Sequence, residues 1–313
     1  MKTLVTGGAG FIGSHLVDAL VARGDDVLVI DDLSSGKRAN LGDATAEGAT
    51  LEVLDITEPR ILMTTIQGFG PEAVFHLAAQ IDVRKSMADP GFDARLNVVG
   101  TLNVLEAASR LGAKQFVFTS TGGAIYGEGA RRPDELPFSE DSPCQPDSIY
   151  GQSKYAAEGY IKLYRRAGRI DGVITRLGNV YGPRQDPALE AGVVAIFCDL
   201  ARDGGRPTIF GEGTQTRDYI HVDDVVAGLL AAQNASGPGP YNLGTGEETS
   251  VLELAETIGS LAGRDDFEPE FAPHRDGEVE RTYLSPELAV NELGWTPKRK
   301  IADGIEQTLA AEA

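Results

Sequence analysis

The sequence predicts an α/β protein with a doubly wound parallel sheet and a smaller C-terminal lobe. Two observations support this fold class. The first half of the 313-residue chain alternates short apolar runs with amphipathic stretches, as strands covered by helices on both faces require. The composition, with 42% hydrophobic and 24% charged residues, is that of a globular protein and is too apolar for a disordered chain.

The elements of the first half follow one another in strand–helix order. We expect strands at Thr3–Thr6, Val27–Ile30, Leu51–Leu54, Ala73–Leu77, Phe116–Thr119 and Val173–Thr175. We expect helices at Ser14–Arg23, Arg60–Gln67, Phe92–Leu111 and Ser148–Ala167, the first of them ended by Gly24. Alternating strands and helices pair in parallel through right-handed crossovers, which gives an open sheet with helices on both faces.

The pattern changes after Arg176, where proline and glycine become frequent and irregular connections, not regular strands, are expected between the helices. We therefore predict a first domain of residues 1–176, rejoined by a segment at about 218–242, and a second lobe of residues 177–217 and 243–313. Ile301, Ile305 and Leu309 recur at a spacing of four and predict a packed helix in the tail.

The charge balance excludes several classes of partner. The chain has 28 Lys and Arg against 47 Asp and Glu, a net charge of −19, which repels nucleic acids and anionic membrane surfaces. Two cysteines are too few for a metal cluster or a disulfide scaffold, so we expect reduced thiols and no metal. No apolar run is long enough for a membrane span or a secretory signal, which predicts a cytoplasmic protein.

A glycine-rich loop connects the first expected strand to the first expected helix. Gly7, Gly10 and Gly13 are typical of a tight turn that lets the backbone approach a pyrophosphate at a helix N-terminus. The strand before the loop and the helix after it indicate a Rossmann-type dinucleotide site. Asp31 follows the second strand, where a carboxylate accepts hydrogen bonds from a ribose diol and repels a 2′-phosphate, so NAD is predicted over NADP.

Three alternatives remain open around this site. Asp31 and Asp32 can simply begin a solvated loop, and the nearby Lys37 and Arg38 can weaken the preference for NAD. Asp55 ends the third expected strand and lies near the adenine by the same geometry, or it is a turn residue at the strand end.

Tyr150 and Lys154 are four residues apart in an expected helix, so the phenol and the ammonium lie on one face. Lowering a tyrosine pKa by about three units, to serve as a base at neutral pH, takes about 4 kcal/mol. A cation at about 4 Å in an effective dielectric of about 20 supplies a similar amount. Such pairs also occur by chance, but this one follows a dinucleotide loop and a hydroxyl-rich strand end, which favours a catalytic base tuned by lysine.

That strand end carries Thr119, Ser120 and Thr121, at the edge where open α/β sheets bind ligands. A hydroxyl there can hydrogen-bond a reacting substrate oxygen and Tyr150, completing a proton path. By position alone any of the three fits this role, and each can equally be a satisfied strand-end hydroxyl.

Several segments occur in the order found in one enzyme family: Gly7–Gly13, Asp31, His76–Gln80, Asn97–Thr101, Thr119–Gly127, Tyr150–Lys154, Arg176–Pro183 and Arg217–Val222. Together they resemble the extended short-chain dehydrogenase/reductase family, and within it the bacterial UDP-glucose 4-epimerases, over nearly the whole chain. The resemblance implies a resident NAD, a nucleotide-sugar-binding second lobe, and interconversion of UDP-glucose and UDP-galactose. The implied steps are oxidation at C4, rotation of the 4-keto sugar and re-reduction on its other face.

The resemblance also implies residue roles. Tyr150 is the base, Lys154 tunes it and binds the nicotinamide ribose, and Thr121 is the catalytic hydroxyl, with Ser120 as the alternative because an extra glycine follows. The residues implied to bind or surround NAD are Gly7, Gly10, Phe11, Ile12, Gly13, Asp31, Asp32, Asp55, Ile56, Leu77, Ala78, Ala79, Gln80, Asn97, Tyr150 and Lys154.

Substrate contacts are implied for Thr121, Tyr150, Asn179, Arg217, Arg275 and Glu278. A guanidinium binds phosphate in a bidentate fashion, which suits a diphosphate on an acidic protein. Alternatively, Arg217 pairs with Asp218 or Asp223, and Arg275 pairs with its acidic neighbours. Thr282 falls near a position where family members carry a large tyrosine or a small residue, so we hypothesise some conversion of UDP-GlcNAc.

Other members of the family remove water or carbon dioxide from nucleotide sugars. Dehydratases carry an Asp-Glu pair where this chain has Gly123-Ala124, and decarboxylases carry a Glu at the second position. Neither glycine nor alanine can move a proton, which favours epimerisation. A 4,6-dehydratase, a UDP-glucuronate decarboxylase or a non-catalytic NAD-binding protein stay as alternatives, the last disfavoured by the presence of Tyr150 and Lys154.

The helices expected at Phe92–Leu111 and Ser148–Ala167 resemble those that form a dimer interface in the family. Their apolar residues serve packing within one chain equally well. On the resemblance we expect a homodimer.

Overall fold

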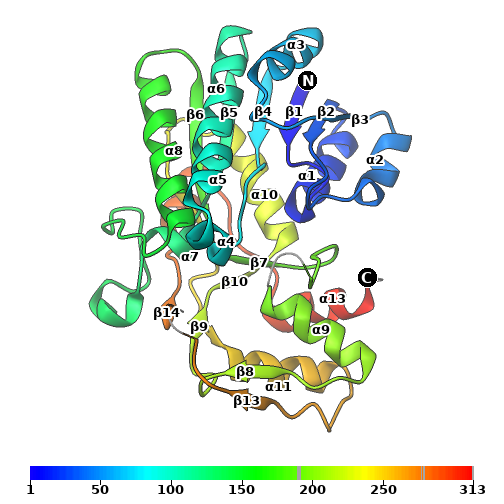
Figure 1. The fold of residues 1–313 in the computed structure, drawn as a ribbon, viewed down its shortest axis with the longest axis vertical. Coiled ribbons are helices and arrows are strands. Elements are labelled where there is room, and N and C mark those ends of the chain that lie inside the picture. Colours follow the sequence, from blue (N-terminus) through cyan, green and yellow to red (C-terminus); the bar gives the residue numbers. More distant parts are fainter. Residues whose placement is uncertain (189–191, 276, 278, 312–313) are drawn as a thin grey trace.

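The structure is a computed structural model that describes all residues except 189–191, 276, 278 and 312–313. At its centre lies a parallel sheet of seven strands in the order β11-β6-β5-β4-β1-β2-β3 (Figure 1). This confirms the predicted fold class. The strands are β1 (Lys2–Thr6), β2 (Asp26–Asp31), β3 (Thr50–Val53), β4 (Ala73–His76), β5 (Gln115–Thr121), β6 (Asp171–Leu177) and β11 (Tyr241–Leu243).

Helices cover both faces of the sheet. Alternate side chains of β1 and β2 enter different cores, because successive residues of a strand point to opposite faces. Val5 and Val29 join the core under α1 (Phe11–Ala22) and α10 (Val222–Gln233). Leu4 and Leu28 join the core under α3 (Pro59–Phe69), α6 (Thr101–Arg110) and α8 (Ile149–Arg166).

The helix predicted at Phe92–Leu111 has three parts. It begins as α5 (Pro90–Ala94), continues through a π-helical segment at Arg95–Gly100, and ends as α6. Asp89 caps its start by accepting a hydrogen bond from the Phe92 N–H. Short π-helical segments inside α-helices frequently mark functional sites, and this one lies beside the site described below. Three short helices, α2 (Gly42–Ala46), α4 (Val83–Ala88) and α7 (Gly122–Ile125), complete this part.

The second lobe has a core of its own between α9 (Val193–Asp203), α11 (Val251–Leu261) and α13 (Ile301–Ala310). The tail helix is therefore confirmed. The expectation of irregular connections without regular strands holds only in part, because strands of two and three residues pair between segments far apart in the sequence. Such strands are too short to leave an alternating pattern. They are β8 (Thr208–Phe210), β9 (Thr216–Arg217), β12 (Thr249–Ser250), β13 (Glu270–Ala272) and β14 (Arg281–Thr282).

Between these segments the chain returns to the large sheet. β7 (Asn179–Tyr181) pairs with β10 (Tyr219–His221), and α10 then runs along the sheet face. β11 pairs with β6 in parallel and extends the sheet by one strand, after which α12 (Glu287–Leu293) packs against β11. The chain thus crosses repeatedly at the carboxyl end of the strands, where the second lobe lies (Figure 1).

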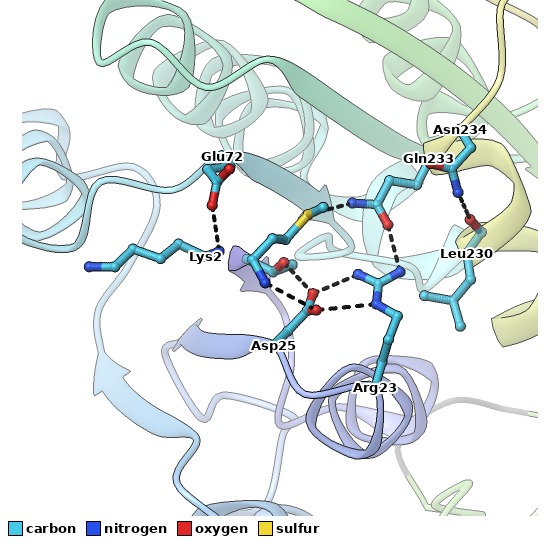
Figure 2. Close-up of polar contacts among 9 residues, drawn as sticks. Lys2, Arg23, Asp25, Glu72, Leu230, Gln233 and Asn234 are labelled. Atoms are coloured by element: carbon cyan, nitrogen blue, oxygen red, sulfur yellow. Dashed lines mark hydrogen bonds and ion pairs between the residues drawn. The ribbon is translucent and has the colours of Figure 1, made fainter.

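At the amino-terminal end of the strands, polar contacts connect β1, the turn after α1 and α10 (Figure 2). Asp25 accepts hydrogen bonds from Arg23 and from the Thr3 hydroxyl, at 2.6 and 2.7 Å. Arg23 also donates to Gln233 of α10 at 2.9 Å. These contacts hold the returning helix against the amino-terminal strand–helix unit. Among the described residues, no helix is both long and apolar enough to cross a lipid bilayer.

Candidate active site

A pocket of about 1420 Å³ opens at the carboxyl edge of the large sheet and extends over the second lobe. Most of the residues singled out from the sequence line it. They are Gly7, Gly10, Phe11, Ile12, Gly13, Asp31, Asp32, Asp55, Ile56, Leu77, Ala78, Ala79, Gln80, Thr121, Tyr150, Lys154, Asn179, Arg217 and Arg275. Asn97 is buried behind the pocket, and Glu278 lies outside the described residues.

The glycine loop lies so close to the loop after β4 that side chains do not fit. Gly7 has φ +72°, and a Cβ added to it would lie 2.6 Å from the Ala78 backbone nitrogen. A Cβ added to Gly13 would overlap the Gly7 carbonyl oxygen. Gly10, at the start of α1, has no side chain that could accept hydrogen bonds from the first N–H groups of the helix. These N–H groups therefore remain available to a ligand in the pocket. This cradle fits the pyrophosphate of a dinucleotide.

Asp31 stands at the end of β2 with 7% of its surface exposed. Its two carboxylate oxygens accept hydrogen bonds from the Ala9 and Leu33 N–H groups, both at 2.9 Å. Burial raises the pKa of this carboxyl. Each oxygen keeps a second lone pair for a ribose hydroxyl. Lys37, whose charge could favour a 2′-phosphate, is paired with Asp186 at 2.8 Å.

Tyr150, Thr121 and Lys154 come together from two elements. Ser148 caps α8 by accepting from the Gly151 N–H at 3.1 Å, so Tyr150 stands in the first turn beside the end of β5. The Thr121 side chain hydrogen-bonds the Tyr150 phenol. Lys154, one turn further along α8, is 3% exposed, and its Nζ lies 4.5 Å from the centre of the Phe118 ring.

The other two hydroxyls of the strand end lie differently. Thr119 donates a hydrogen bond to the His76 carbonyl at 3.1 Å. It therefore fits the alternative considered above, a strand-end hydroxyl whose hydrogen bond is made within the protein. The Ser120 oxygen is buried and has no hydrogen-bond partner among the described residues. Thr121 is therefore the hydroxyl of this group that reaches Tyr150.

The electrostatics of the pair differ from the estimate made from the sequence. Burial raises the pKa of Tyr150 and outweighs the hydrogen bond from Thr121, while the Asp93 carboxylate raises it further. Burial lowers the pKa of Lys154 to about 7, against the opposing charges of Asp93 and Glu158. The prediction that one lysine supplies most of the free energy needed to bring the pKa of Tyr150 to neutrality does not hold for the protein without cofactor. That estimate counted the attraction of a cation and left out desolvation of the phenolate.

Sequence reasoning missed two residues that support this group. Asp93 is fully buried and acts with Asn97, four residues later on the same helix face, a spacing that could have revealed it. Ser86 accepts a hydrogen bond from the Tyr150 N–H at 3.1 Å and fixes the start of α8. It lies in a segment for which no element was expected, so the sequence held no signal for it.

Two arginines of the second lobe face the pocket. The guanidinium carbon of Arg275 lies 3.4 Å from the centre of the Phe210 ring, so the two groups stack. Arg217 donates to the Thr216 carbonyl at 2.8 Å. Of the acids considered as its surface partners, Asp218 accepts from the Thr245 N–H and hydroxyl and from the Leu284 N–H. Asp223 is paired with Arg299 at 3.0 Å.

Small residues of α7 form part of the pocket wall where α7 packs against the start of α8. Gly123 and Ala124 line the pocket, and a Cβ added to Gly123 would lie 3.2 Å from the Asn179 side-chain oxygen. A longer side chain at Gly123 therefore requires Asn179 to move. Thr282 pairs with Arg217 through β14 and β9, is 2% exposed and is not among the residues that line the pocket.

Comparisons with known proteins agree with this geometry. The sequence profile described as "NAD dependent epimerase/dehydratase family" matches residues 3–244. This chain belongs to that family. A UDP-glucose 4-epimerase of Mycolicibacterium smegmatis is 46% identical over 311 residues, covering 99% of this chain and 97% of the relative. The matched range runs from β1 to the end of β11, so it contains the whole large sheet and the returning segment.

Solved structures of similar proteins extend the comparison. A UDP-glucose 4-epimerase of Thermotoga maritima, crystallised with UDP-glucose, superposes with a TM-score of 0.94 at 42% identity, covering 99% of this chain and 97% of that one. A UDP-glucose 4-epimerase of Thermus thermophilus in complex with NAD gives 0.90 at 40% identity, covering 99% and 98%. These two structures thus share the architecture described here over nearly the whole chain.

Proposed function

We propose that this protein is an NAD-dependent UDP-glucose 4-epimerase, which interconverts UDP-glucose and UDP-galactose. The observation that carries the proposal is the Tyr150 phenol, hydrogen-bonded to Thr121 and followed by Lys154, in one pocket with the glycine loop and the second-lobe arginines. The names of the similar proteins support it, since those at 40–46% identity are UDP-glucose 4-epimerases.

The residues of the first domain would hold the cofactor. The α1 N-terminus with Gly7, Gly10 and Gly13 would hold the pyrophosphate, and Asp31 would accept hydrogen bonds from the adenosine ribose. When bound, NAD supplies a hydride acceptor that returns the hydride to the same substrate. A buried carboxylate at Asp31 disfavours the 2′-phosphate of NADP, in line with the predicted preference.

Tyr150 acts on the sugar 4-hydroxyl. Its phenolate oxygen takes the hydroxyl proton, directly or through the Thr121 hydroxyl, and gives it back when the 4-keto sugar is reduced. Lys154 favours the phenolate by its positive charge and would help to hold the nicotinamide ribose. Burial raises the pKa of Tyr150, so the positive charge that oxidised NAD would bring would act together with Lys154 in favour of the phenolate.

The second lobe, residues 177–217 and 243–313, would hold the nucleotide. We assign the diphosphate and uridine to Asn179, Arg217 and Arg275, with Glu278 toward the uridine ribose. A firmly held UDP leaves the hexose free to rotate about its bond to the diphosphate. Rotation is required because one site must present both faces of C4 to the cofactor.

The competing reactions lack a proton-transfer group in this pocket. Water elimination or decarboxylation needs an acid or base at the positions of Gly123 and Ala124. Gly123 lies against Asn179, which leaves little room for one. Epimerisation requires no group there.

We also propose a homodimer formed through α8. Tyr155 and Leu163 are 41% and 49% exposed, and they flank Gly159 at a spacing of four on this helix. A Cβ added to Gly159 would meet nothing within 4 Å, so nothing in the described monomer requires glycine there. Glycine inside a helix costs about 1 kcal/mol relative to alanine. The close approach of a second copy of α8 accounts for it.

The dimer is tested by measuring the mass in solution. We expect twice the chain mass of 33.2 kDa for the wild type and one chain mass for Leu163→Glu. Leu261→Glu, at a similarly exposed leucine of α11, is the matched control and should stay dimeric. A monomeric wild type refutes the interface. We further propose a cytoplasmic enzyme of galactose metabolism, in keeping with the two free cysteines.

The activity is tested with UDP-galactose and no added NAD. We expect conversion to a product of unchanged mass, and release of NAD from the purified protein on denaturation. A product lighter by one water or one carbon dioxide would favour the alternative reactions, and no conversion would refute the proposal. UDP-GlcNAc should be compared in the same assay, since activity on it remains a prediction.

A further inference from the structure

A buried carboxylate lies beside the Tyr150–Lys154 pair without contacting the pocket. Asp93 of α5 has no exposed surface. One of its oxygens, Oδ1, accepts hydrogen bonds from Gln80 Nε2 at 2.9 Å and from Asn97 Nδ2 at 3.0 Å. The other, Oδ2, is also buried and has no hydrogen-bond partner among the residues that the structure describes. Leaving a buried carboxylate oxygen unpaired is costly, so it calls for a physical reason.

The bonded oxygen builds the wall of the pocket. Gln80 and Asn97 exchange two hydrogen bonds, from the Gln80 N–H to Asn97 Oδ1 and from Asn97 Nδ2 to the Gln80 carbonyl, at 2.9 and 2.8 Å. Asp93 closes this arrangement by binding both side-chain amides. Since Gln80 lines the pocket, Asp93 is connected to the site through a rigid set of hydrogen bonds.

The unpaired oxygen leaves a negative charge in the neighbourhood of Lys154. α5 packs against α8, and the charge of Asp93 acts on both Lys154 and Tyr150. Lys154 is 3% exposed and rests over the Phe118 ring, so water does not compensate its ammonium. An ammonium buried in this way requires a nearby anion to remain charged.

The other titratable groups around Lys154 are less able to supply that anion. Glu158, one turn further on α8, binds Arg176 through both oxygens, at 2.9 and 2.7 Å, and is 3.7 Å from Lys162. His76 of β4 is hydrogen-bonded to Thr6 and Thr101, and burial lowers its pKa to about 3, so it is neutral. Tyr150 is protonated in the resting site, since burial raises its pKa.

We propose that Asp93 is a positioning residue of the reaction, which supplies the buried negative charge that favours the ammonium form of Lys154 and at the same time fixes Gln80 and Asn97. Its importance for turnover rests on the proposed function. Its effect on Lys154 does not, because that effect belongs to the folded protein.

The test compares Asp93→Asn with Asp89→Asn in the full chain, at equal cofactor content. Asparagine at 93 keeps an acceptor for Gln80 and Asn97 and removes the charge. Asp89 begins the same helix but is exposed, and asparagine is as good a helix cap as aspartate. The readout is the titration of lysine side chains labelled with ¹³C at Cε, followed by NMR and assigned to Lys154 by the signal missing in Lys154→Met.

We expect Asp93→Asn to lower the titration midpoint of Lys154 by about one pH unit or more, as loss of a nearby opposite charge does. Asp89→Asn should leave the midpoint unchanged, since solvent screens an exposed charge. An unchanged midpoint in Asp93→Asn overturns the proposal. A purely structural role for Asp93 would lower the melting temperature without moving that midpoint.

A second measurement applies if Asp93→Asn does not fold. In Lys154→Met the Asp93 charge loses its partner, so the double variant Asp93→Asn/Lys154→Met should melt at a higher temperature than Lys154→Met alone. A lower or equal melting temperature overturns the proposal. Neither readout uses UDP-galactose conversion. A shifted midpoint in a protein without epimerase activity therefore refutes the proposed function alone, and conversion without a shift refutes this inference alone.

Discussion

The buried ion pair between Glu158 and Arg176 leads to a prediction about what holds α8, the helix that carries Tyr150, in place. Glu158 lies two turns after Tyr150 on α8, and Arg176 lies on β6, so the pair fastens the helix to the sheet. Both side chains are almost fully buried, at 0% and 2% exposure. Arg176 also donates to the Tyr126 hydroxyl, which in turn donates to Asn242 of β11.

Replacing Glu158 by Gln leaves the Arg176 guanidinium buried without its anion. Arginine cannot release its proton to escape, and the pKa of Arg176 is raised further by Glu158. Breaking a buried pair from one side costs about 3–5 kcal/mol. With about 2.1 cal/mol/K of unfolding entropy per residue, this corresponds to a fall in melting temperature of roughly 5–8 °C for a chain of this length.

The assay is thermal unfolding of Glu158→Gln, Arg176→Met and the double variant Glu158→Leu/Arg176→Met. The double variant should recover most of the stability that Glu158→Gln loses, because it removes both charges and fills the space with apolar groups. A melting temperature of Glu158→Gln within about 1 °C of the wild type would refute the reasoning, since it would mean that the guanidinium is solvated or neutralised by another group.

Four further outcomes are expected. Tyr150→Phe should keep its fold and its bound NAD and lose about 10²–10⁴-fold in turnover, measured with UDP-galactose; retained turnover would exclude Tyr150 as the base. Gly13→Ala should purify without NAD, measured by the nucleotide released on denaturation, because its Cβ would overlap the Gly7 carbonyl. Without cofactor, Lys154 binds fewer protons in the folded than in the unfolded chain between its lowered pKa of about 7 and its ordinary value of about 10.4. The raised pKa values of Cys144 and Cys198 act in the opposite direction in this range. The stability of the wild type relative to Lys154→Met should therefore rise from pH 7 to pH 9 in denaturant titrations. Arg275→Lys should raise the KM for UDP-galactose up to about tenfold with kcat nearly unchanged, since lysine loses the planar stacking on Phe210 and the bidentate contact with phosphate.

Most of the sheet could be predicted because most of its strands are buried on both faces and are separated by amphipathic helices; the edge strand β3 is an exception, since it is largely exposed. The short strands of the second lobe could not, since β9 and β14 exist through pairing between residues 216–217 and 281–282, which no local pattern records. The same difference applies to the site. Tyr150 and Lys154 could be recognised from the sequence as a pair, because their spacing of four places them on one helix face. Ser86 could not, because it contacts Tyr150 from a position 64 residues away in the sequence.

The pKa of Tyr150 could not be predicted from the sequence. A spacing of four places a cation beside a phenol, but the sequence does not give the depth at which both are buried. The depth of burial decides whether the pKa of Tyr150 rises or falls. In water the lysine charge would lower the pKa of the phenol, whereas in this site desolvation raises it. The same burial brings the pKa of Lys154 to about 7, so the ammonium itself depends on neighbouring carboxylates. On the proposals above, Tyr150 would be activated by Lys154 and a positively charged cofactor, with Asp93 supporting the charge of Lys154. That role would give a physical reason for the buried carboxylate oxygen of Asp93 that has no hydrogen-bond partner among the described residues.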